Sequence, residues 1–147
     1  MWKNGEGRYI TGNFATNQEG VDTQNLSAMV IVEGTLGVAD TGGGVASLKN
    51  PFGVDVIVLD AVLDITTKAA AACTVDAGIA ANGTTLNDKL IDGLDVHTAT
   101  GVFSNVHSGG TNGKIQKWGK DQFFTASKAS GAAAGLKGKF YLRCIVA

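Results

Sequence analysis

The strongest constraint on the fold is a period-two alternation of residue types within residues 50–81. Alternate positions in its first half are all apolar: Ile57, Leu59, Ala61, Leu63 and Ile65. The positions between and before them mix valine with aspartate: Val54, Val56, Val58, Asp60, Val62 and Asp64. Successive residues of a strand point to opposite faces, so we expect the first set in a core and the second on a mixed, partly solvated face.

The same alternation predicts further strands. In residues 73–79, one face carries Cys73, Val75, Ala77 and Ile79. In residues 27–36, Ala28, Val30, Val32 and Leu36 share one face, opposite Met29, Ile31, Glu33 and Thr35. In residues 139–147, the face expected in the core carries Phe140, Leu142, Cys144 and Val146. Shorter strands are predicted at residues 45–48, 102–106 and 122–126.

Glycine-rich segments at residues 40–44 and 109–113 separate these strands and predict turns, and residues 129–135 are expected to form a loop. Residues 85–91 are the best helix candidate, because Leu86 and Leu90 are four positions apart, Thr84 or Thr85 can cap the start and Gly93 can follow the end. The predicted fold class is therefore all-β: a β-sandwich or jelly roll of about seven to eight strands with one short helix.

Residues 1–26 differ from the rest of the chain. They are rich in Gly, Asn, Gln and Thr, and no helical or strand period organises their apolar residues. Such a segment either packs on its own domain or lies along a partner. Spaced apolar side chains favour the partner, since each can anchor in a separate pocket. We therefore expect an extended N-terminal docking arm over residues 1–26 and a β-sandwich domain over residues 27–147, with docking by Trp2, Tyr9, Ile10 and Phe14.

Charge and hydropathy exclude several classes of partner. The chain has 12 basic and 13 acidic residues, so it lacks the excess of positive charge that holds nucleic acid. No apolar run reaches the roughly 18 residues that a membrane span requires. The first residues lack a signal-peptide core, so we expect synthesis in a cytoplasm, where Cys73 and Cys144 stay as buried free thiols.

Only 17% of the residues are charged, and 21 of the 147 are glycine. An ordinary soluble domain has about 25% charged residues. Two explanations fit this composition equally well. Much of the surface meets another protein, or the chain is a β-protein with many glycine turns.

No grouping of residues predicts catalysis. His97 follows Asp92 and Asp95, but that spacing is not a known metal-ligand pattern and suits an exposed loop better. Asp60 and Asp64 lie about 13 Å apart along a strand, too far for a catalytic carboxylate pair. We therefore expect no enzyme activity, no metal and no cofactor.

Trp118 has basic neighbours at Lys114, Lys117 and Lys120, with Phe123 and Phe124 beyond them. Such a patch can stack on bases or sugars. A core tryptophan flanked by lysines whose stems lie along apolar surface is the preferred interpretation.

Residues 45–147 resemble small virion proteins of tailed bacteriophages, the structural, decoration or cement proteins. The similarity lies in the overall residue pattern of three segments and not in a catalytic motif. The segments are residues 50–85, LIDGLDV at residues 90–96, and residues 112–143. It implies a β-sandwich or jelly-roll module on the outside of an icosahedral head, with the major capsid protein as partner and often as a homotrimer at three-fold positions. The low charge also favours a homotrimer, and the implied location is the exterior of the virion. The arm lies outside the resemblance.

Two other classes of function remain open. The first is a carbohydrate-binding or host-adhesion module on a virion, for which Trp118 with Tyr141 is the candidate aromatic platform. The second is a small enzyme whose site is assembled across subunits, which would require His97, His107 and the aspartates to converge. A tail component or a shell-forming subunit would also fit the resemblance.

Overall fold

The computed structural model describes residues 29–37 and 44–147, which form nine strands and one short helix. The strands are β1 (Met29–Leu36), β2 (Gly44–Lys49), β3 (Val56–Thr67), β4 (Cys73–Ala80), β5 (Ile91–Asp95), β6 (Gly101–Ser104), β7 (Gln116–Trp118), β8 (Phe123–Gly131) and β9 (Lys137–Val146). The helix is α1 (Asn105–Ser108). The expected all-β class is therefore confirmed.

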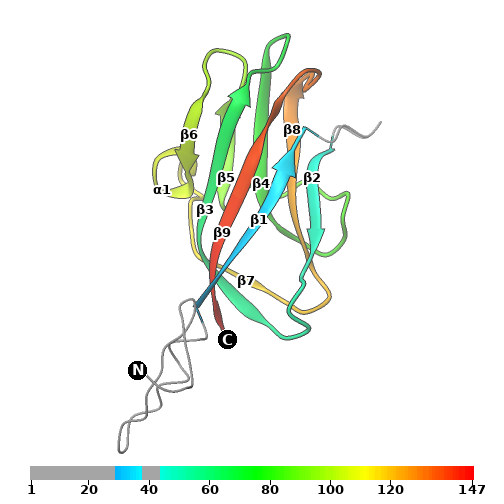
Figure 1. The fold of residues 1–147 in the computed structure, drawn as a ribbon, viewed down its shortest axis with the longest axis vertical. Helices are drawn as coiled ribbons and strands as arrows, with labels where there is room; N and C mark the ends of the chain where they lie inside the picture. Colours follow the sequence, from blue (N-terminus) through cyan, green and yellow to red (C-terminus); the bar gives the residue numbers. More distant parts are fainter. Residues whose placement is uncertain (1–28, 38–43) are drawn as a thin grey trace, which may run out of the picture.

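The strands form two antiparallel sheets (Figure 1). One sheet has the order β1-β9-β3-β6, with β7 also paired to β3, and the other has the order β2-β8-β4-β5. If β7 is set aside, the pairing is nested: the first strand pairs with the last, the second with the next to last, and so inward to the pair β4–β5. Each of the first four strands therefore pairs with a strand from the second half of the described chain.

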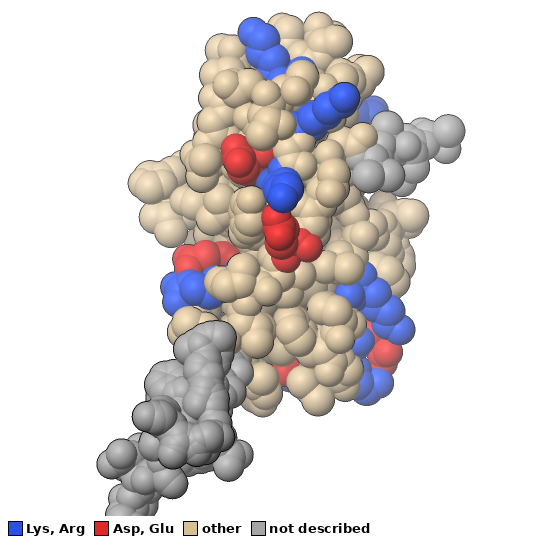
Figure 2. All heavy atoms as spheres, in the orientation of Figure 1, with Lys and Arg blue, Asp and Glu red and all other residues tan. Residues whose placement is uncertain are grey.

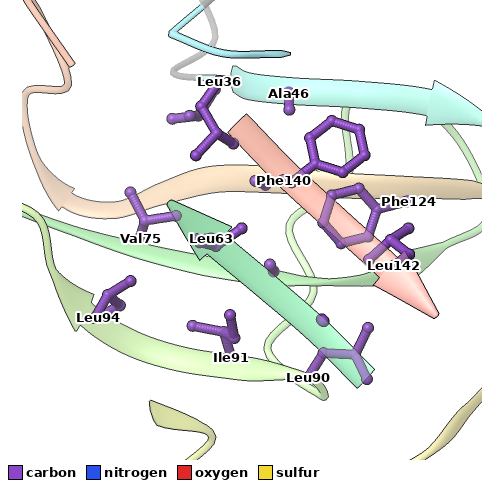
Figure 3. Close-up of a cluster of buried hydrophobic side chains, with 14 of the residues drawn as sticks. Leu36, Ala46, Leu63, Val75, Leu90, Ile91, Leu94, Phe124, Phe140 and Leu142 are labelled. Atoms are coloured by element: carbon purple, nitrogen blue, oxygen red, sulfur yellow. The ribbon is translucent and has the colours of Figure 1, made fainter. Parts of the chain in front are cut away.

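One apolar core lies between the sheets (Figure 3). Phe124 from the four-stranded sheet meets Phe140 from the five-stranded sheet, with ring centroids 4.8 Å apart. The largest side chains that are essentially inaccessible to solvent include Trp118, Phe124, Leu63, Leu90 and Leu142. Burial of each such side chain contributes about 1.5–3 kcal/mol, so the core holds the two sheets together.

The predicted faces of β3 are correct in only one half of the strand. Ala61, Leu63 and Ile65 lie in the core as expected, but in the first half the buried residues are Val56 and Val58, not Ile57 and Leu59. The pairing of β3 with β9 shifts between Val58 and Asp60, which is a β-bulge with one extra residue in β3. An extra residue exchanges the two faces of a strand, and a sequence alternation cannot reveal it.

The predicted core faces of β1, β4 and β9 agree with the structure except at one position, but β4 is not half-buried as expected, because Asp76 and Gly78 on its other face are buried too. Val32, Leu36, Cys73, Val75, Phe140, Leu142 and Cys144 are buried. Val146, expected in the core, is 47% exposed, because β9 ends there and the core does not extend past it.

The helix expected at residues 85–91 is absent. The Asn82 side chain accepts hydrogen bonds from the backbone N–H groups of Thr84 and Thr85, and Asn87 accepts one from Lys89. These local turns compete with a helix, and Ile91 then begins β5 beside β4. The one helix in the described residues, α1, instead takes the end of the strand expected at residues 102–106.

The strand count also differs from expectation. The described residues hold nine strands, more than expected. The sequence does not predict β5 and β7, because both are short and carry no clear alternation. The loop expected at residues 129–135 begins late, since β8 continues through Gly131.

One side chain takes the place of a neighbouring strand at Ile79, beyond the residues of β4 that pair with β5. Gln116 of β7 accepts a hydrogen bond from the Ile79 N–H at 2.9 Å and donates one to the Ile79 carbonyl at 3.3 Å. These are the two bonds that a neighbouring strand would make. Gln116 thereby links the five-stranded sheet to the edge of the four-stranded sheet.

Candidate functional site

The outward face of the five-stranded sheet carries an exposed apolar surface next to its edge strand β1. In the strand register, Met29 lies opposite Ile145, which lies opposite Ile57, and Ile31 lies opposite Arg143, which lies opposite Asp60. Residues directly opposite in an antiparallel pair point to the same face. We call this surface the β1 face; it consists of Met29, Ile31, Ile57, Asp60, Arg143 and Ile145.

The apolar members of the β1 face are accessible to solvent. Met29 is 46% and Ile31 61% exposed, while Ile57 and Ile145 are half-buried. The sequence alternation places Met29 and Ile31 together on one side of the strand, but it does not show that the other described residues leave this side exposed.

The charges on the β1 face neutralise each other. Arg143 donates from Nη2 and Nε to Asp60 Oδ2, at 2.5 Å and 2.6 Å, and from Nη1 to the Met29 sulfur at 3.8 Å. Beyond this row, Glu33 and Lys139 lie diagonally across β1 and β9: Lys139 Nζ lies 2.6 Å from Glu33 Oε2, and this hydrogen bond raises the pKa of Lys139. Figure 2 shows red and blue groups in contact in the middle of this view, surrounded by uncharged surface.

The outward face of the four-stranded sheet is different, because the chain covers it. Thr125 and Gly78 lie opposite each other there, and the Thr125 hydroxyl donates to the Thr85 carbonyl at 2.9 Å. A Cβ atom on Gly78 would lie 2.0 Å from the amide oxygen of Asn87. The segment between β4 and β5 is therefore packed directly on this sheet.

Two hollows lie beside β1. One, of about 570 Å³, is lined by residues that include Asp64, Lys139 and Tyr141 on the outward face of the five-stranded sheet. The other, of about 360 Å³, lies between β1 and β2 and includes Phe140 in its lining. Neither hollow gathers the several buried polar groups that fix a small ligand in place.

Trp118 is a core residue, as preferred from the sequence. Its side chain is completely buried, its ring nitrogen donates to the Gln122 carbonyl at 3.0 Å, and its ring meets Phe52 edge to face at 6.2 Å. It cannot form an exposed platform with Tyr141, so the aromatic surface considered for sugar binding does not exist in this arrangement.

Asp95, His97 and His107 form hydrogen bonds with the loops around them. Asp95 accepts hydrogen bonds from the backbone N–H groups of His97 and Thr98 and from the Thr98 hydroxyl, and these bonds, the hydroxyl first, lower the pKa of Asp95. His97 Nδ1 lies 2.9 Å from the Ala69 carbonyl, and His107 Nδ1 lies 3.2 Å from the Ser104 hydroxyl. Within residues 29–37 and 44–147, no three His, Cys, Asp or Glu side chains are grouped to hold a metal ion.

Both cysteines are buried free thiols, as expected. Burial raises the pKa of Cys144 to about 11 and also raises the pKa of Cys73. A thiol needs its thiolate form to act as a nucleophile, so neither group is suited to covalent catalysis near neutral pH.

The docking residues predicted in the arm, Trp2, Tyr9, Ile10 and Phe14, lie outside the described residues. Comparison with family models, with curated proteins and with solved structures finds no match to this chain. No helix in the described part of the chain is long and apolar enough to cross a membrane.

Proposed function

We propose that this chain is a bacteriophage capsid decoration, or cement, protein that binds the outside of the icosahedral head and stabilises the mature shell. Its partners in this proposal are the major capsid protein and further copies of itself, in a homotrimer. The protein is made in the host cytoplasm, resides on the capsid exterior, and acts without a cofactor.

The observation that carries this proposal is the β1 face. It is an exposed apolar surface whose charges are already paired, and Met29, one of its members, is three positions after the last residue of the proposed docking arm. Burial of such a surface against another protein has a small free-energy cost of desolvation, because few unpaired charges become buried. A chain with such a face and a separate arm can contact two proteins at once.

Bridging of this kind explains how a small domain would stabilise a shell. A protein that binds only the mature arrangement of capsid subunits shifts the equilibrium toward that arrangement. Several weak contacts made by one linked assembly combine into a strong one through high effective concentration. Neither effect requires a catalytic group.

We further propose that the two sheets form a jelly roll. The nested pairing supports this topology, since it brings β1 against β9, β2 against β8, β3 against β6 and β4 against β5. Eight strands in two sheets built this way are typical of viral capsid and lectin domains. The short β7 is then an insertion beside β3.

Deletion of residues 1–26 tests the docking arm. We expect the deletion variant to fold and to lose all or most of its binding to purified mature heads of the phage that encodes the chain. The measurement is the number of copies bound per head, with thermal unfolding as the check on folding. Full occupancy by the deletion variant would contradict the role of the arm.

A full-length variant with Trp2, Tyr9, Ile10 and Phe14 replaced by serine is the matched test, because it keeps the length of the arm. Weak binding by both variants attributes docking to these side chains. A glycan array probed with the intact protein separates decoration from adhesion, since specific glycan binding without head binding would favour the alternative.

A further inference from the structure

Within the described residues, the β1 edge lacks several of the devices that usually protect an edge strand. Proteins blunt such edges with short strands, bulges, proline or lysine. β1 is eight residues long, pairs with β9 without a register shift, and contains neither proline nor lysine. The opposite edge strand of the same sheet, β6, has four residues.

The exposed apolar residues of β1 lie beside this unprotected edge. Met29 and Ile31 form the outer ends of the two cross-strand rows of the β1 face. Arg143 lies behind them, held between Asp60 and the Met29 sulfur. Arginine fixed by a carboxylate among apolar side chains is typical of the centre of protein interfaces.

We propose that the β1 face binds a second copy of this chain. This inference rests on the proposed self-assembly and names the surface responsible for it. The occupant is a second copy because identical faces can meet without repulsion when the charges of each face are already paired. Within the face, the Asp60 carboxylate pairs with the Arg143 guanidinium, and beside it Glu33 pairs with Lys139. Copies can therefore meet here, around the axis of the proposed homotrimer, with apolar side chains in contact and no unpaired charge.

The position of the arm agrees with a contact between copies at this face. The proposed arm ends only three positions before Met29 in the sequence, so chain connectivity would keep the arms of copies that meet here near one another. A cluster of arms at one point can reach neighbouring subunits of a shell, as the proposed function requires.

Replacement of Ile31 by aspartate tests the inference. Ile31 is 61% exposed, so Ile31→Asp is expected to fold normally, but association would then bury an unpaired carboxylate. We expect sedimentation of the full chain to show self-association weakened roughly tenfold or more. The control is Val106→Asp on α1, which is 72% exposed and lies on the β6 side of the sheet, and its association should match the wild type.

If the wild type sediments as a monomer, contact between copies at the β1 face is tested on purified heads, with Ile31→Cys and a bis-maleimide cross-linker. The native thiols are buried, so the new thiol is the reactive group. Covalent dimers on the heads, and none with Val106→Cys, support the inference.

Several results would overturn it. One is equal association of Ile31→Asp and Val106→Asp. Another is a wild type that is monomeric in solution and gives no Ile31→Cys cross-link on heads that it occupies. A third is unchanged association together with loss of head binding in Ile31→Asp, which would assign the β1 face to the capsid protein. Failure of every variant and of the wild type to bind heads would instead refute the proposed function, and sedimentation would still decide this inference.

Discussion

The outward faces of the two sheets differ in how far the chain covers them. On the four-stranded sheet, Thr125 is 1% exposed, because the segment between β4 and β5 is packed over it. On the five-stranded sheet, Ile31 is 61% exposed, and no described part of the chain covers it. The chain covers the middle of one outward face, around Thr125 and Gly78, while the other outward face keeps apolar surface available to another protein.

The difference shows what each face contributes. The covered face adds buried contacts to the stability of the monomer, so substitutions there should change the free energy of unfolding. The β1 face contributes little to that free energy, so substitutions there should change association instead.

Leu142→Ala should give the largest loss of stability. Leu142 is completely buried beneath the five-stranded sheet, between Val32 and Ala61 in the register, and removal of such a side chain costs about 2–5 kcal/mol. Ile31→Ala on the outward side of the same sheet should change stability by less than about 0.5 kcal/mol. Denaturation with urea measures both, and similar losses would mean that the outward side is as important to the fold as the core.

Thr125→Val should give a smaller loss. The variant keeps the shape of the side chain but removes the hydroxyl that donates to the Thr85 carbonyl, which costs about 1 kcal/mol. Amide exchange in residues 81–90 should also accelerate. Thr35→Val, on the exposed side of β1, is the control and should leave both measurements unchanged. An unaltered exchange rate in residues 81–90 would show that this hydrogen bond does not hold the cover in place.

Asp76→Asn should show the smallest effect, and one that depends on pH. Asp76 is 7% exposed; burial raises its pKa, the Gly93 N–H that donates to it at 2.7 Å opposes this shift, and Asp92 and Asp88 add to it. Because the folded pKa lies above the unfolded one, the wild type loses stability as the pH rises from the unfolded pKa of about 3.9 through the folded pKa. The asparagine variant lacks this loss and can still accept the Gly93 bond.

Unfolding of Asp76→Asn and the wild type should therefore be compared from acidic to neutral pH. The variant should gain stability relative to the wild type as the pH rises and then reach a plateau. A relative loss with rising pH would show that the ionised Asp76 is stabilised by the fold.

The sequence predicts this fold well wherever alternation is unbroken. The core faces of β1 and β4, and of β9 up to Cys144, follow from period two alone, as does the all-β class, whereas burial of the other face of β4 does not. The prediction is wrong in the first half of β3, because one extra residue near Leu59 exchanges the faces and leaves every residue type compatible with a strand. It is also wrong at residues 85–91, where Asn82 and Asn87 form local turns in a segment that has helical spacing.

The candidate site could be predicted only in part. Alternation places Met29 and Ile31 on one side of a strand, but exposure depends on whether another segment covers them, which is a tertiary property. The pairing of Arg143 with Asp60 joins residues 83 positions apart, and the bulge sets their register. Trp118, in contrast, was correctly assigned to the core from its neighbours.

The nested pairing has a consequence for the order of events during synthesis. β9 occupies an interior place in its sheet, between β1 and β3, yet it is the last of the nine strands to leave the ribosome. Met29 must wait for Ile145, more than a hundred positions later, before their pair can form. Contacts this distant in the chain are typical of slow folding, in the range of milliseconds to seconds. A chain that stopped before β9 would lack the strand that joins β1 to β3. Loss of the C-terminal strand would therefore disrupt the interior of the sheet and not its edge.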